Sequence, residues 1–309
     1  MSLGEFQLIN TFVSCFPPAD VPVGIGDDCA ILSVRARTWC VTTDALVENV
    51  HFSRPLFSWA DIGHKALAVN LSDLAAMGAT PAWFVCALGL PVQIRSSQIR
   101  SMALGMAALA RQFSIQLVGG NITRSTQVTL TRTATGTLPS VSRSLTRSGA
   151  SPNDRVYVSG TLGGAAAGLQ GYNSSRQRRP QPQIRLGQLA LDYGSAAIDV
   201  SDGFAQDLSH LCRSSQVGAR IEVDRLPLDR ALGGAEPHTA LNWAIAGGED
   251  YELIVTVPEK RAAAFERACA RQGQPVSAVG KITRGKSVKL ESLRFGRIEP
   301  TPGFDHFKN

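Results

Sequence analysis

The chain has 309 residues, a length that favours two domains. Of these residues 44% are hydrophobic and 18% charged, which is the composition of a globular protein, and the formal net charge is +6. It contains no uninterrupted apolar run of eighteen residues and no basic start followed by a long apolar core. The sequence therefore predicts neither a membrane span nor a secretory signal, and we expect a cytoplasmic protein.

Cysteine and histidine spacing limits the kinds of metal site. Six cysteines without a CxxC pair and five histidines without an HExxH pair predict no disulfide framework and no zinc site. Any bound metal is therefore expected to have oxygen ligands, which favours Mg²⁺ or Ca²⁺.

The first half of the chain alternates predicted strands and helices. Apolar runs predict strands at 38–47, 83–91, 114–120 and 128–136. Apolar spacing predicts helices at 60–79 and 96–113, capped by Asp61 and Ser96. A polar, turn-rich segment at 138–154 then predicts a junction between domains.

The second half repeats the alternation. Its predicted strands lie at 155–160, 195–203, 251–258 and 276–283, and its predicted helices at 162–170, 204–215 and 259–273. We therefore expect a two-domain chain of the α/β (α+β) class, divided into residues 1–139 and 140–309. Between two of these elements, the segment 171–187 is rich in Ser, Gln, Arg and Pro, so it is either a mobile surface loop or a lid over an anionic ligand.

A long stretch of the chain carries only positive charge. Leu74 to Asn153 contains no Asp or Glu and seven arginines, which indicates either an anionic partner or a solvated surface. No aromatic RNP-like motif, zinc-finger spacing or Lys/Arg cluster accompanies it, so we expect no nucleic-acid partner.

Acidic residues stand beside five predicted buried elements. They are Asp27 and Asp28 before an apolar run, Asp44 behind Thr42 and Thr43 at a strand end, Asp73 in an apolar helix, Asp199 and Asp202 around a strand end, and Glu249 with Asp250 before another strand. Each alone has a structural explanation, such as a helix cap or a turn. Together they indicate bound cations, because burying unpaired carboxylates is costly and Mg²⁺ with phosphate oxygens compensates for it.

Familiar nucleotide motifs are missing. The sequence has no Walker A motif and no protein-kinase HRD or DFG set. If the chain handles ATP, we expect metal ions and arginine to hold the phosphates.

Several motifs occur in an order typical of one family. They are "GIGDDCAIL", "TTDALVENVHF", "HKALAVNLSDLAAMGATPAW", "LVGGNITRS", "LTRSGASPND", "AIDVSDGFAQDL" and "AGGEDYELIVTVP". In this order they closely resemble the thiamine-monophosphate kinases of the aminoimidazole-ribonucleotide-synthetase-like superfamily, over nearly the whole chain.

The resemblance implies a fold, a reaction and a set of site residues. It implies an N-terminal domain that pairs across a homodimer, and transfer of the γ-phosphoryl group of ATP to thiamine monophosphate with several Mg²⁺ ions. The implied metal ligands are Asp28, with its neighbour Asp27, and Thr42, Thr43, Asp44, Asp73, Asp199 and Asp202. The implied ATP contacts are Gly119, Gly120, Arg147 and Ser201, and the implied acceptor contacts are His51, Glu249 and Phe304.

The implied reaction fits the acidic residues. The acceptor phosphate, with a second pKa near 6, is mostly ionised at neutral pH, so no general base is needed. The main obstacle is repulsion between two anions, which metal ions reduce. Phe304 is the candidate aromatic wall for the acceptor rings, although the C-terminal "GFDHFKN" also fits a simple docking segment.

One position departs from the family pattern. Asn121 stands where the family has an Asp that binds Mg²⁺, and an amide oxygen can ligate the ion without bringing charge. We therefore expect a weaker metal site. Two alternatives remain: another ATP-using enzyme of the superfamily, such as a selenophosphate-synthetase-like protein, for which Cys15 lacks the expected setting, and a non-catalytic nucleotide-binding relative.

Overall fold

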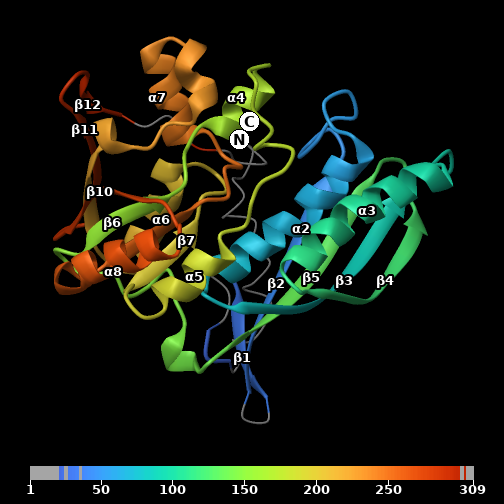
Figure 1. Cartoon of the computed structure of the whole chain (residues 1–309), viewed down its shortest axis with the longest axis horizontal. Coiled ribbons are helices and arrows are strands. Elements are labelled where there is room, and N and C mark those ends of the chain that lie inside the picture. Colours follow the sequence, from blue (N-terminus) through green and yellow to red (C-terminus); the bar gives the residue numbers. More distant parts are fainter. Residues whose placement is uncertain (1–20, 24–26, 35–36, 300–302, 304–309) are drawn as a thin grey trace, which may run out of the picture.

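The computed structural model describes residues 21–23, 27–34, 37–299 and 303, which form two β-sheets with helices around them (Figure 1). The five-stranded sheet has the order β1 (Ala30–Val34), β2 (Arg37–Val47), β5 (Thr129–Leu138), β3 (Thr80–Leu90) and β4 (Gln116–Arg124). The seven-stranded sheet has the order β12 (Gly296–Ile298), β11 (Val288–Ser292), β8 (Gly218–Glu222), β10 (Val276–Thr283), β6 (Arg155–Ser159), β9 (Leu253–Val257) and β7 (Ala196–Asp199).

The α-helices are α2 (Trp59–Ala76), α3 (Ser96–Gln112), α4 (Gly164–Leu169), α5 (Ile184–Ala190), α6 (Phe204–Ser214), α7 (Pro237–Ala246) and α8 (Glu259–Arg271). Short 3-10 helices lie at Val141–Arg143, Val223–Arg225 and Arg230–Gly234. None of the helices in the described part of the chain is both long and apolar enough to cross a bilayer.

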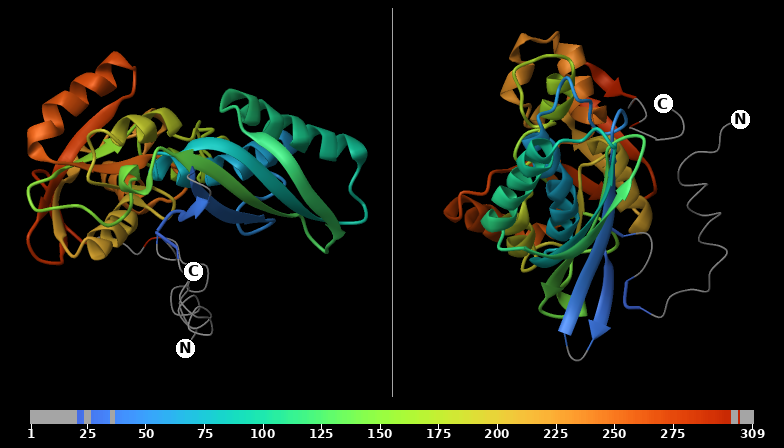
Figure 2. Two further views of the ribbon diagram at one scale, coloured as in Figure 1. Left: turned by 90° about the horizontal axis from the view of Figure 1, so that it is seen from below. Right: turned by 90° about the vertical axis from the view of Figure 1, so that its right-hand side faces the viewer.

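Helices α2 and α3 cover one face of the five-stranded sheet, and no described helix covers the other face (Figure 2). The strand sequences explain this asymmetry. In β5, Leu130 and Ala134 are buried toward the helices, whereas Thr131 and Thr133 alternate with them and point to the open face. Within the described part of the chain, the first sheet therefore presents a helix-free face that carries threonines.

Helices cover both faces of the seven-stranded sheet around β9, and β9 is accordingly buried along its whole length. In β9, Leu253 and Val255 join the core shared with α2, α5 and α8. The intervening Ile254 joins a second core with α6 and α7. Helix α2 contacts both sheets, which explains why it is buried on nearly all sides.

The expected fold class is confirmed, while two helix starts differ from expectation. Helix α2 has Ser58 as its N-cap, and Asp61 is the third residue of a capping box instead of the cap. Helix α3 is preceded by Arg95 at the cap position instead of Ser96. Helix α2 begins one residue earlier than expected, whereas α3 begins at the expected residue and only its cap position differs. Sequence patterns do not locate helix ends to within one or two residues.

Candidate active site

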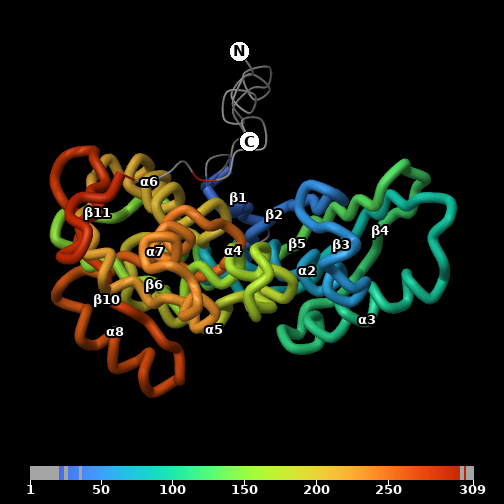
Figure 3. Tube along the Cα trace, turned by 90° about the horizontal axis from the view of Figure 1, so that it is seen from above, coloured from blue at the N-terminus to red at the C-terminus, as the bar shows by residue number. Residues whose placement is uncertain are grey.

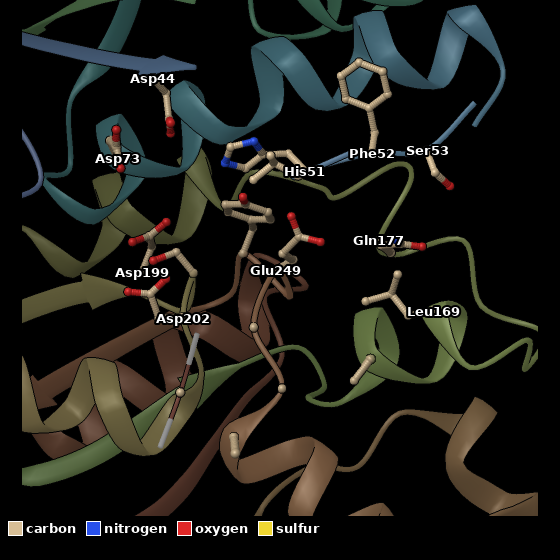
Figure 4. A pocket seen from close by; sticks show the side chains of 18 of the residues that line it. Asp44, His51, Phe52, Ser53, Asp73, Leu169, Gln177, Asp199, Asp202 and Glu249 are labelled. Carbon is tan, nitrogen blue, oxygen red and sulfur yellow. The ribbon is translucent and has the colours of Figure 1, made fainter. Parts of the chain in front are cut away.

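A cavity of about 620 Å³ lies between the two halves of the molecule. Its walls come from the β2–α2 connection, α2, the region of α4, the β7–α6 turn and the α7–β9 connection. Figure 3 shows α4 and the chain that follows it beside the β2–α2 connection, so both halves contribute to the cavity. The close-up in Figure 4 shows four aspartates at one end and Phe52, Leu169 and Gln177 at the other.

Three carboxylates meet at the acidic end. One carboxylate oxygen from each of Asp28, Asp73 and Asp199 lies within 4.8 Å of the others. Two hydroxyls hold them: Thr42 donates to Asp73, and Ser72 Oγ donates to Asp199 Oδ2 at 2.7 Å. The three acids come from the start of the chain, from α2 and from the end of β7, so only tertiary packing brings them together.

Burial and mutual repulsion raise the pKa of two of these acids, Asp73 and Asp199. Burial, followed by the neighbouring charge of Asp28, raises the pKa of Asp199 to about 8. Burial, followed by the charges of Asp199 and Asp44, raises the pKa of Asp73 well above its ordinary value. A divalent cation would remove both costs, because it replaces water and neutralises the repulsion. A cluster made only of hard oxygen donors fits Mg²⁺.

Two more aspartates flank the cluster (Figure 4). Asp44 lies inside β2 on the same face as Thr42, and not after the strand end as the sequence suggested. Asp202 lies in the β7–α6 turn, whose shape depends on Asp207. One oxygen of Asp207 accepts hydrogen bonds from the backbone N–H groups of Ser201, Asp202 and Gly203 at 3.0 to 3.1 Å. This carboxylate therefore orients both Ser201 and Asp202 toward the cavity.

Arg147 brings positive charge to the acidic end. Its guanidinium donates to both oxygens of Asp28, at 2.8 and 3.2 Å, and its side chain lines the cavity. Its backbone N–H donates to Asp27 Oδ1 at 3.0 Å. Burial is the main reason that the pKa of Asp27 rises to about 6. Arg147, which lies in the junction after the first sheet, thus hydrogen-bonds both members of the Asp27–Asp28 pair.

The middle of the cavity is formed by His51 and Glu249 (Figure 4). Glu249 and Tyr251 have φ angles of 67° and 51°, a left-handed conformation that is strained for residues other than glycine. Between them, Asp250 turns away from the cavity and accepts hydrogen bonds from the N–H groups of Gly163 and Ala165 at 2.6 and 2.9 Å. The strained backbone therefore points Glu249 into the cavity while Asp250 caps α4.

Several expected residues lie elsewhere. The side chain of Thr43 points to the open face of the sheet, where its hydroxyl donates to the carbonyl of Arg132 at 3.0 Å. Gly119, Gly120 and Asn121 lie on β4, in a separate groove beside α3. The structure does not bring these four residues into the acidic cavity of the same chain. Phe304 lies outside the described residues.

Sequence reasoning missed three residues of the site, namely Lys65, Asp207 and Gln177. The sequence did contain a signal for Lys65, because it is the one lysine of a largely apolar helix and a buried lysine requires a partner. Asp207 reads as an ordinary residue of the first turn of α6. Gln177 stands in a polar loop, where nothing distinguishes it from its neighbours.

The arrangement of a two-sheet fold around a buried acidic cluster defines a class of protein. The sequence models described as "AIR synthase related protein", N-terminal and C-terminal domain, match residues 26–138 and 151–292. The chain is 42% identical to thiamine-monophosphate kinase of Escherichia coli (strain K12) over 330 residues, covering 99% of each chain. It belongs to the thiamine-monophosphate kinase family.

Solved structures agree with this assignment. The thiamine-monophosphate kinase of Stenotrophomonas maltophilia K279a superposes with a TM-score of 0.79 at 38% identity, covering 94% of this chain and 97% of that one. The structure of AaThiL complexed with AMPPCP and TMP gives a TM-score of 0.86 at 31% identity, covering 99% of this chain and 97% of that one.

Proposed function

We propose that this chain transfers the γ-phosphoryl group of ATP to thiamine monophosphate, giving thiamine diphosphate and ADP, with Mg²⁺ required. The observation that carries the proposal is the convergence of Asp28, Asp73 and Asp199 in a cavity shared by both halves of the molecule. Full-length relatedness to thiamine-monophosphate kinases supports the choice of acceptor.

The acidic end of the cavity is the proposed metal and phosphate site. Its ligands would come from Asp27, Asp28, Thr42, Asp44, Asp73, Asp199 and Asp202. Thr43 would take part only through its backbone, because its side chain points to the open face of the sheet. Bound Mg²⁺ would neutralise and align the phosphate oxygens. Arg147 would add permanent positive charge beside them, and Ser201, held by Asp207, would contact ATP.

The chemistry needs positioning and charge neutralisation more than proton transfer. An oxygen of the acceptor phosphate attacks the γ-phosphorus, and the bond to the β–γ bridging oxygen breaks, so that ADP leaves with that electron pair. The acceptor oxygen is already mostly ionised at neutral pH, and no general base is assigned. His51 and Glu249, in the middle of the cavity, would contact the acceptor, with Phe304 as a further candidate.

The proposed enzyme is a homodimer that pairs through the open face of the five-stranded sheet. This face carries the exposed Trp83 beside Trp39, with ring centroids 6.3 Å apart, and the row of threonines of β5. Because Gly119, Gly120 and Asn121 lie outside the cavity of their own chain, we propose that they serve the ATP site of a second copy. We assign neither nucleic acid nor membrane as a partner and place the enzyme in the cytoplasm.

The test is an assay of purified protein with ATP, Mg²⁺ and thiamine monophosphate. We expect thiamine diphosphate and ADP in equal amounts, no turnover with EDTA, and poor turnover of free thiamine, which lacks the acceptor phosphate. ATP binding without formation of thiamine diphosphate would favour a non-catalytic relative. ATP hydrolysis that thiamine monophosphate does not change would favour another enzyme of the superfamily.

A further inference from the structure

The end of the cavity opposite the aspartates is apolar and partly open. Leu56 and Leu169 line it and are 46% and 50% exposed, which is unusual for leucines at the wall of a cavity. Phe52 and Ala166 line the cavity as well. Such a surface fits the flat face of a ring, which would cover these side chains when bound.

Polar side chains also reach this end of the cavity, among them Ser53 and the more deeply placed Gln177 (Figure 4). Gln177 lines the cavity and is 4% exposed, and no hydrogen bond reaches its amide from any other described residue. The amide atoms of Gln177 are not among the fully buried unpaired side-chain atoms, so they keep contact with the space of the cavity. An amide that no protein group pairs and that faces a cavity is free to pair with a bound ligand.

The chain holds Gln177 in place from both sides. Arg176 forms ion pairs with Glu252 at 2.6 Å and Asp229 at 2.9 Å, both in the second half of the molecule. Two residues after Gln177, Arg179 forms an ion pair with Asp61 of α2 at 2.5 Å. Pro180 follows, and its carbonyl is 2.9 Å from His64 Nε2 of α2. The segment spans the two halves, and Gln177 lies between the two attachments.

The direction of the acceptor in the cavity follows from its charge. If the proposed function holds, the phosphate of thiamine monophosphate must reach the aspartates, where the γ-phosphoryl group is transferred. The thiazolium ring is attached next to the phosphate arm, and the aminopyrimidine is the part farthest from it. The aminopyrimidine therefore reaches the end formed by Leu56, Leu169 and Gln177 (Figure 4).

We propose that Gln177 determines specificity for the acceptor by pairing with its aminopyrimidine. The ring offers an amino donor next to a ring-nitrogen acceptor. The amide of Gln177 offers the complementary pair, with its oxygen accepting from the amino group and its nitrogen donating to the ring nitrogen. A site built to pair such groups discriminates strongly against ligands that lack them.

The test combines one substitution with one truncated substrate. Gln177→Leu removes the amide and keeps a similar volume, and the N-methylthiazolium phosphate keeps the acceptor's charge and phosphate but lacks the pyrimidine. We expect Gln177→Leu to raise the KM for thiamine monophosphate about tenfold, with kcat and the KM for ATP within about twofold of wild type. The KM for the truncated substrate should change by less than about twofold, since the pairing partner is already absent.

The control is Gln181→Leu, the same substitution at an exposed position of the same segment, which should leave all these constants unchanged. An equal rise in KM for both substrates, or none for either, would overturn the assignment. If thermal melting shows that Gln177→Leu does not fold, Gln177→Glu enters the same comparison, because a carboxylate cannot donate to the ring nitrogen. A wild-type enzyme that does not phosphorylate thiamine monophosphate would instead refute the proposed function.

Discussion

The fully buried Lys65 donates through Nζ to Glu249 Oε1 at 2.5 Å, joining α2 of the first half to the wall of the cavity in the second. The same ammonium group donates to the carbonyl of His51 at 2.9 Å. One lysine thus orients both residues that we propose to contact the middle of the acceptor. Because Lys65 is fully buried and does not line the cavity, we assign it a positioning role.

Lys65→Met should therefore weaken both folding and acceptor binding. Removing one partner of a buried ion pair leaves the other charge unpaired, and we expect a loss of about 3 kcal/mol in the free energy of unfolding. The KM for thiamine monophosphate should rise more than the KM for ATP. Urea denaturation and steady-state kinetics measure the two effects, with the exposed Lys260→Met as the matched control. Equal changes in the two KM values would argue for a purely structural role.

Asp44→Asn should reduce kcat by at least about a hundredfold while the protein remains folded, because the charge removed lies beside the proposed metal site. Asp202→Asn should behave in the same way. The exposed Asp192→Asn is a control for loss of one negative charge. Circular dichroism confirms folding, and near-normal turnover of both site variants would show that these acids are structural.

The buried His210 should make the free energy of unfolding depend on pH, and a substitution at this position can test that contribution. Burial, aided by the charges of Arg147 and Arg213, lowers the pKa of His210 to about 4, whereas a histidine in an unfolded chain has a pKa near 6.5. Between these values the unfolded state binds a proton that the folded state does not. This histidine therefore reduces stability as the pH falls from about 6.5 to 4.

In His210→Gln that contribution should disappear. Urea denaturation at pH 7 and pH 4.5 should show a smaller loss of unfolding free energy for the variant than for the wild type. The control is the same substitution at the exposed His238, His238→Gln, which should lose as much unfolding free energy as the wild type. If the wild type and His210→Gln lose the same unfolding free energy between the two pH values, the lowered pKa of His210 is contradicted.

Gly119 offers a test of the proposed dimer. A Cβ atom at this position would meet nothing closer than Val85 Cγ1 at 3.7 Å, so Gly119→Leu should fold normally. If a second copy places ATP phosphates against this glycine, the leucine should abolish turnover. Mixing inactive Gly119→Leu with inactive Asp44→Asn should then restore activity, because a mixed dimer contains one site with neither change. No recovery after subunit exchange, verified by mass, would count against a shared site.

Asn121→Asp should lower the Mg²⁺ concentration that gives half-maximal turnover, because a carboxylate adds charge to the proposed metal site. The KM for ATP at saturating Mg²⁺ should change little. A titration of turnover against Mg²⁺ measures the effect, and the neighbouring Thr123→Asp on the same strand serves as the control. An unchanged titration curve would mean that Asn121 does not reach the metal in either copy.

Much of the fold could be predicted from local sequence, because periodic burial and capping act over a few residues. The alternation of β5 and the apolar surface of α2 were readable in this way, and the family motifs pointed to Asp28, Asp73 and Asp199. The outward direction of Thr43 was also readable, since neighbouring residues of a strand point to opposite faces. The sequence alone therefore determined the classes of element and the acidic character of the site.

Tertiary structure decided which of these residues meet. The Lys65–Glu249 pair joins residues far apart in sequence, and nothing local favours that partner over another carboxylate. Gln177 gains its environment only because Arg176 and Arg179 attach its loop to opposite halves of the molecule. Gly119 and Asn121 lie apart from the acids because β4 is an edge strand. Such placements depend on the packing of whole sheets and helices, which local patterns do not encode.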